Sequence, residues 1–308
     1  MTASVRAFCG LSSQRLIDYC TIAFRGLRTL GFRRTQPAPV ARSLPASLQP
    51  APGLRGMPDR VAGAPVAMLI LGFDTTSSSG GTALYRDLEP LDEVRADGST
   101  NYSVQLFEMT DRLLARAGLK LAEVDLFAVA TGPGSFTGIR VGLAAAQGWA
   151  RALGRPVRGV SVLEAMVADA RPPGSIAVPL LNAHRGEFYL GVFRSSPQDA
   201  AGATPGPAWT PSTEGLALGP VRIEALAREL ADEAGAEVAF IVREHDEAAR
   251  DLRDHIPEAA QWITVPGFHA GAVARVAFEA AREGRVHRPD ELDAYYIRRS
   301  DAELNWQE

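Results

Sequence analysis

Residues 68–84 read Met68-Leu-Ile-Leu-Gly-Phe-Asp-Thr-Thr-Ser-Ser-Ser-Gly-Gly-Thr-Ala-Leu84. The continuous apolar run that ends in Asp74 is typical of a strand buried on both faces. A turn of small polar residues separates it from a second predicted strand, Gly81 to Tyr85. Such a turn leaves backbone amides free to approach an anion, and the carboxylate could hold a metal-bound water. Asp74, Thr75 and Ser77 are therefore candidates for binding a nucleotide phosphate; the alternative is a polar hairpin without a ligand.

Strands and helices alternate along the chain after this stretch. The hydrophobic pattern predicts further strands at 91–95, 126–130 and 156–160, with helices at 101–117, 135–153 and 162–170. A second block follows, with strands at 176–181, 187–193 and 238–242, helices at 221–234 and 270–282, a long loop at 196–215, and a final strand or docked extension at 293–299. This order predicts an α/β fold with two lobes, each a mixed sheet flanked by helices. The predicted ranges are 68–172 for the first lobe, 173–267 for the second, and 268–308 for a C-terminal helix that packs back on the first lobe, plus a tail.

Residues 1–67 differ from the rest in composition. They hold nine of the 32 basic residues but only two of the 36 acidic ones, together with Pro-rich stretches. A segment with so few apolar residues cannot support a core. We expect a disordered extension or a start assigned too far upstream, with Met68 or Met57 as the true start; an Arg-rich targeting segment is the alternative. No run of 18 apolar residues occurs, which predicts no membrane-spanning helix.

The rest of the chain is acidic, with 23 basic and 34 acidic residues. An acidic domain is a poor direct binder of RNA phosphates, so a role in RNA chemistry would require a partner that holds the RNA. Cys9 and Cys20 are the only cysteines, which excludes a disulfide framework or a cysteine-based zinc site beyond them. This composition fits a reducing compartment, and the expected location is the cytoplasm.

A second motif, residues 131–143, reads Thr131-Gly-Pro-Gly-Ser-Phe-Thr-Gly-Ile-Arg-Val-Gly-Leu143. A glycine-rich turn that leads from a strand into a helix suits an anion site, although the spacing is neither Walker A nor Rossmann. The helix also carries a stripe of small residues that would permit close approach of another helix. The stripe consists of Gly138, Gly142, Ala145 and Ala146, with Trp149 beside it. It could pack inside its own domain or against another subunit.

A third motif, residues 182–189, reads Asn182-Ala-His-Arg-Gly-Glu-Phe-Tyr189 and places polar groups between two predicted strands. His184 could act as an acid or base, but it has no partner nearby in the sequence, which favours a structural turn. The five histidines form no His-x-x-x-His or His-Glu-x-x-His pair, and no Gly-x-Ser-x-Gly elbow is present. The sequence therefore predicts no catalytic residue and no metal ligand.

The segments Ile70 to Thr76, Thr131 to Arg140 and Asn182 to Tyr189 resemble the three signature regions of the TsaB family of tRNA threonylcarbamoyladenosine biosynthesis proteins. The resemblance extends from about Met68 to the end of the chain. It implies an ASKHA (actin/hexokinase-like) fold and a non-catalytic scaffold role beside a TsaD-type subunit, which places threonylcarbamoyl on adenosine 37 of tRNA. It further implies a TsaE-type ATPase as partner, tRNA contact only through the complex, and no cofactor except ATP or ADP at the partner interface.

The resemblance also implies that helices 101–117 and 135–153 pair with equivalent helices of the TsaD-type partner, or with a second copy of this chain. The predicted interface residues are Val104, Phe107, Gly138, Gly142, Ala145, Ala146 and Trp149. On this view Gly142→Arg leaves the fold intact and abolishes pairing. The sequence departs from the family at Asn101-Tyr-Ser, where TsaD proteins carry a His-x-x-x-His metal pair and TsaB proteins often keep His-Ser.

Two enzymatic alternatives remain open. One is an ATP-dependent ASKHA transferase or kinase that uses Asp74 and the turn 75–81. Active enzymes of this fold need a second phosphate loop with Asp and paired glycines, and residues 175–194 contain neither. The other is a glycoprotease-like metalloenzyme, which the absence of metal-ligand pairs disfavours.

Overall fold

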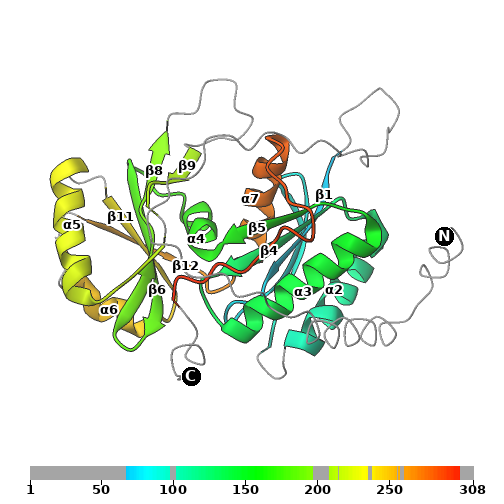
Figure 1. The fold of residues 1–308 in the computed structure, drawn as a ribbon, viewed down its shortest axis with the longest axis horizontal. Helices are drawn as coiled ribbons and strands as arrows, with labels where there is room; N and C mark the ends of the chain where they lie inside the picture. Colours follow the sequence, from blue (N-terminus) through cyan, green and yellow to red (C-terminus); the bar gives the residue numbers. More distant parts are fainter. Residues whose placement is uncertain are drawn as a thin grey trace, which may run out of the picture. The chain divides into compact units, whose positions relative to one another are not determined.

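The first sheet is built around β1 (Leu69–Asp74), whose six residues are all buried. The computed structural model describes residues 67–97, 102–196, 208–213, 215–234, 238–254, 256 and 260–298, so the predictions for residues 1–66 and for Asn101 lie outside it. The strand order is β3-β2-β1-β4-β5 (Figure 1). β1 pairs antiparallel with β2 (Gly81–Arg86), which pairs antiparallel with β3 (Glu89–Arg95). On its other side β1 pairs parallel with β4 (Leu126–Gly132), which pairs parallel with β5 (Val157–Ser161).

Helices cover both faces of this sheet (Figure 1). α2 (Tyr102–Ala117) and α3 (Phe136–Leu153) pack on one face, and α7 (Ala270–Arg282) packs on the other. α3 begins after Ser135, whose side chain accepts a hydrogen bond from the amide of Gly138, and ends at Gly154 in the left-handed conformation. These are the start and stop signals that the sequence predicts. A short 3-10 turn, η2 (Leu121–Glu123), leads into β4.

The second sheet has the central order β10-β7-β6-β11-β12. Its strands are β6 (Ile176–His184), β7 (Glu187–Leu190), β8 (Phe193–Ser196), β9 (Ala208–Pro211), β10 (Leu216–Leu218), β11 (Val238–Arg243) and β12 (Gln261–Val265). Two helices belong to this lobe, α5 (Pro220–Ala234) and α6 (Glu247–Arg253). The sequence pattern missed α6, β9, β10 and β12, because each is seven residues or shorter and carries little periodicity.

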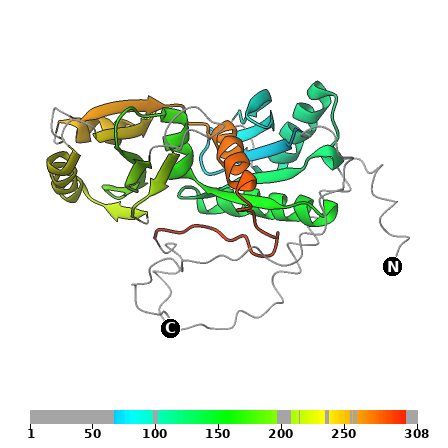
Figure 2. The ribbon, with the colours of Figure 1, turned by 90° about the horizontal axis from the view of Figure 1, so that it is seen from above.

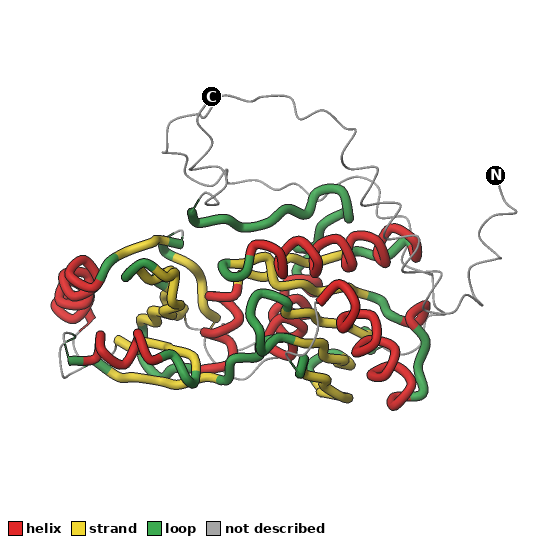
Figure 3. Tube along the Cα trace, turned by 90° about the horizontal axis from the view of Figure 1, so that it is seen from below, coloured by secondary structure: helices red, strands yellow, loops and turns green. Residues whose placement is uncertain are grey.

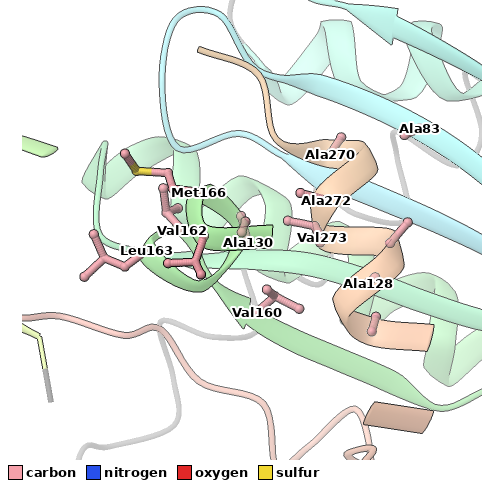
Figure 4. Packing of buried hydrophobic residues seen from close by; sticks show 14 of the residues in the cluster. Ala83, Ala128, Ala130, Val160, Val162, Leu163, Met166, Ala270, Ala272 and Val273 are labelled. Atoms are coloured by element: carbon pink, nitrogen blue, oxygen red, sulfur yellow. The ribbon is translucent and has the colours of Figure 1, made fainter. Parts of the chain in front are cut away.

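Small side chains let α7 lie close to the first sheet (Figure 4). Ala128, Ala130 and Ala83 on the strands face Ala272 and Val273 on α7, and all of them are buried. The same cluster includes α4 (Val162–Ala170), which contacts both sheets. One continuous apolar core therefore joins the two lobes.

The chain after α7 docks as an extended segment along α3 (Figures 2 and 3). Val157 and His287 form an isolated antiparallel bridge, and the amide of Tyr295 donates to the carbonyl of Thr131 at 2.8 Å. Arg298 then forms an ion pair with Glu187 of the second lobe at 3.0 Å. The segment predicted as a final strand or docked extension is thus an extension that contacts both lobes. No helix among the described residues has the length and apolar character needed to cross a membrane.

Candidate functional site

The turn after β1 and the glycine-rich turn before α3 are hydrogen-bonded to each other. The amide of Ser135 donates to the carbonyl of Thr76 at 2.7 Å, and the hydroxyl of Thr75 donates to the carbonyl of Gly138 at the same distance. A Cβ atom at Gly134 or Gly138 would collide with the backbone of Thr76 or Thr75. The glycines are needed because the turn after β1 lies directly on the start of α3.

This packing corrects the predicted partner interface. Gly138 and Gly142 face Thr75 within their own lobe, and Ala145 and Ala146 are buried in the same lobe. Trp149 is 4% exposed and lies against the rings of Phe73 and Phe127, with centroids at 5.3 and 6.2 Å. Helical periodicity showed that the small residues share a face, but it could not show whether that face points inward.

A second stripe of α3 points outward instead. Val141 and Ala144 are half-buried, and a side chain added at Gly148 would meet no atom within 4 Å. On α2, Val104 is 45% exposed, and the half-buried ring of Phe107 packs edge-on against Trp149. Of the predicted interface residues, only Val104 and Phe107 therefore lie at the surface of this helix pair.

Asp74 lies at the end of β1, fully buried, where the two lobes meet. Its Oδ1 accepts hydrogen bonds from the amide and the hydroxyl of Thr76, at 3.0 and 2.6 Å. Its Oδ2 accepts from the amide of His269 at 3.2 Å and lies 4.0 Å from Nη2 of Arg243 on β11. Both carboxylate oxygens therefore have partners within the chain.

The turn after Asp74 is closed by Tyr102, at the start of α2. The Tyr102 hydroxyl donates to the carbonyl of Ser77 at 2.6 Å and accepts from the amide of Gly80 at 2.7 Å. Burial raises the pKa of Tyr102 to about 12, although the hydrogen bond from Gly80 opposes the shift. The Ser77 hydroxyl donates to the carbonyl of Gly267 at 3.4 Å. Asp74, Thr75 and Ser77 do gather in one place, but their polar groups are engaged by neighbouring residues.

A chain of charged side chains continues from Asp74 behind the turn. Nε of Arg243 donates to Nε2 of His269 at 3.0 Å, and Nδ1 of His269 lies 2.7 Å from Asp169. Arg275 donates to the other oxygen of Asp169 at 2.7 Å. Burial raises the pKa of Asp169, but the hydrogen bonds from His269 and Arg275 and the positive charge of Arg275 outweigh it, so the net shift is downward.

Sequence reasoning missed this cluster entirely. Its members come from β11, α4, the N-cap of α7 and α7 itself, and the pairs in contact lie 26 to 106 residues apart along the chain. None stands in a recognisable motif, and His269 is simply one of the scattered histidines. Only the fold brings these side chains together, so no local pattern could have found them.

The third motif forms the β6–β7 hairpin of the second lobe. His184 and Arg185 both have positive φ values, and the His184 amide donates to Oδ1 of Asn182 at 2.8 Å. The His184 side chain is exposed. A cavity of about 400 Å³ lies beneath the hairpin, against Pro220 and Leu252. The polar motif thus shapes a tight turn, and His184 lines this cavity together with Glu187 and Asp251.

Comparison with known proteins finds relatives in one tRNA-modification pathway. The chain is 32% identical over 127 residues to the tRNA threonylcarbamoyladenosine biosynthesis protein TsaB of Bacillus subtilis, covering 41% of this chain and 56% of that protein. It is 32% identical over 138 residues to the TsaB of Escherichia coli, covering 41% and 55%. The chain therefore spans about half the length of the curated relatives that it matches.

A solved structure from Pseudomonas aeruginosa, described as an uncharacterized protein with similarity to peptidase YEAZ, superposes with a TM-score of 0.58 at 22% identity, covering 75% of this chain and 100% of that one. The likeness confirms the predicted two-lobed ASKHA-type fold. The sequence model of one family, described as TsaD, tRNA N6-adenosine threonylcarbamoyltransferase, matches residues 96–306, more than half of the chain. The protein accordingly belongs to the TsaD family, as a TsaB-like (YeaZ-like) member.

Proposed function

We propose that this protein is a non-catalytic subunit required for threonylcarbamoylation of adenosine 37 in tRNA, and that it acts by pairing with a TsaD-type catalytic subunit. Its similarity to proteins named for tRNA threonylcarbamoyladenosine biosynthesis supports the pathway. The observation that carries the non-catalytic role is the closed turn after β1. The carboxylate of Asp74 and the turn that follows are hydrogen-bonded to Thr76, Tyr102 and His269.

The surface best suited to the partner is the outward face of α2 and α3. Val104 and Phe107 on α2, with Val141, Ala144 and Gly148 on α3, combine exposed or half-exposed apolar groups with small side chains. Small residues on a helix let a second helix pair approach closely. The acidic charge of residues 68–308 supports contact with tRNA through the complex rather than by this chain alone. The same proposal includes a TsaE-type ATPase as partner, pairing of two copies of this chain, and binding of ATP or ADP at the interface.

Co-purification with a TsaD-type subunit tests the pairing. We expect Gly148→Arg to abolish it, because the long cation would stand in the close-contact surface while leaving its own lobe undisturbed. Val221→Arg is the matched control, since Val221 is 78% exposed on α5 of the other lobe. Unchanged co-purification of Gly148→Arg would reject this interface. Equal loss with Val221→Arg would show that the effect is nonspecific.

The second candidate is that the chain itself transfers the threonylcarbamoyl group. The description of the matched family, which names a transferase, favours it. The described residues offer no group of three or more His, Cys, Asp or Glu arranged to hold a metal ion. Assay of tRNA modification by the isolated chain separates the two candidates: turnover that disappears in Asp74→Asn would establish the enzyme.

A further inference from the structure

The buried contact between the lobes contains a cation supplied by the chain itself. The side chain of Arg243 is 10% exposed and reaches from the end of β11 toward Asp74 on β1. The carboxylates of Asp74, Asp246 and Asp169 all act on its charge. A buried carboxylate such as Asp74 is costly unless an opposite charge or hydrogen bonds compensate it. The guanidinium supplies that charge next to Asp74, which begins the turn that the sequence marks as a candidate phosphate site.

The hydrogen bond from Arg243 also fixes the protonation state of His269. A guanidinium has only donors, so Nε2 of His269 must accept the hydrogen bond from Nε of Arg243. The remaining nitrogen, Nδ1, then carries the proton and donates it to Asp169. Because the ring is completely buried, the geometry requires a neutral His269 in the Nδ1–H form. Whether Nε2 of His269 carries a proton thus reports on whether Arg243 is in place.

We infer that Arg243 is the resident cation of the inter-lobe site: it balances the charge of Asp74, where a bound cation would otherwise be needed, and links the lobes through His269 and Asp169. Nη2 of Arg243 has no hydrogen-bond partner among the described residues, and one water bridging to Asp74 would satisfy it. Arg275 on α7 forms an ion pair with Asp169 and is the last member of this series of charged side chains. The contact between the lobes is separate from the α2–α3 surface, so the role of Arg243 is tested separately from the proposed function.

A double-mutant cycle on the full-length chain tests the link between Asp74 and Arg243. Thermal unfolding is compared for the wild type, Arg243→Met, Asp74→Asn and the double variant. Removing the cation alone leaves buried carboxylates unbalanced, and we expect the Tm to fall by on the order of 10 °C. The double variant should lose less than the sum of the two single losses. Arg253→Met is the matched control, because Arg253 lies over Trp262 on the surface of the same lobe; its Tm should change by about 2 °C or less.

Nitrogen-15 NMR of His269 gives a readout that a loss of packing would not produce. The wild type should show the neutral Nδ1–H form of His269. If Arg243→Met does not fold, Arg243→Lys is measured instead, because it keeps the charge but not the planar guanidinium. Gain of a proton on Nε2 in that folded variant supports the inference, because Nδ1–H stays hydrogen-bonded to Asp169. Additive Tm losses in the cycle, an Nε2–H form in the wild type, or an Asp74-dependent rise in wild-type Tm with Mg²⁺ and ADP would each overturn it. Co-purification with a TsaD-type subunit should be unaffected by Arg243→Lys, so the co-purification experiment reports on pairing alone.

Discussion

At the scale of single residues, Tyr102 shows how a turn suited to an anion is closed from within. One hydroxyl group satisfies both the amide of Gly80 and the carbonyl of Ser77, and it belongs to a different element from the turn. The sequence identified Asp74 and the small residues after it. It could not identify Tyr102, because a single aromatic residue at the start of a helix carries no signal of the turn that it contacts.

Tyr102→Phe should lower the free energy of unfolding by about 1–3 kcal/mol, because it leaves the Gly80 amide and the Ser77 carbonyl with only the hydrogen bond between them, at 3.4 Å. The substitution also predicts a difference at high pH. Burial raises the pKa of Tyr102 from its ordinary value near 10 to about 12, so the native state keeps the phenol proton that the unfolded chain loses. The wild type should therefore lose stability between pH 10 and about 12. Urea denaturation across this range measures it, and an equally steep loss in Tyr102→Phe would contradict the assignment.

At the scale of elements, α3 was predicted correctly in type and extent, with its start after Ser135 and its end before Gly154. Its orientation was not predicted. The helix carries small residues on two sides, Gly138 and Gly142 on one and Ala144 and Gly148 on the other. Periodicity fixes which residues share a side, whereas the choice of the inward side depends on Thr75, more than 60 residues earlier in the chain.

The two sides of α3 should respond oppositely to the same substitution. Gly142→Arg places a side chain against the Thr75 hydroxyl and Val129, and should cost more than about 4 kcal/mol or prevent folding. Gly148→Arg faces open space and replaces a poor helix former, so stability should stay constant or rise by up to about 1 kcal/mol. Thermal unfolding of both variants checks this, and a folded, stable Gly142→Arg protein would restore the interface that the packing excludes.

The segment after α7 is held by one buried apolar side chain and a few polar contacts. Leu292 is 8% exposed and lies over Gly159 of β5, and its carbonyl accepts a hydrogen bond from Gln147 on α3 at 2.7 Å. Leu292→Ala should lower the free energy of unfolding by about 2–3 kcal/mol. Trypsin cleavage at Arg285 and Arg298 should be accelerated in this variant and not in Val221→Ala, a substitution at an exposed site. Unchanged cleavage would show that other contacts hold the segment.

At the scale of the whole molecule, the alternation of strands and helices was enough to predict two α/β lobes. The core that joins the lobes was not predictable in the same way. It is formed by α4, which precedes the second block in the sequence, and by α7, which follows it. The series of charged side chains from Asp74 to Arg275 was not predictable for the same reason. Together these contacts occupy the polar groups between the lobes and leave the outer face of the α2–α3 helix pair open, which is the arrangement expected of a partner subunit.

Reconstitution of the tRNA modification is the most direct test of that view. The modified nucleoside is measured by mass spectrometry after incubating tRNA with this protein, with a TsaD-type subunit, and with both, in the presence of a TsaE-type ATPase, ATP and the threonylcarbamoyl donor. We predict modification only when both proteins are present, and its loss when Gly148→Arg replaces the wild type. Modification by this protein alone, abolished by Asp74→Asn, would contradict the non-catalytic role.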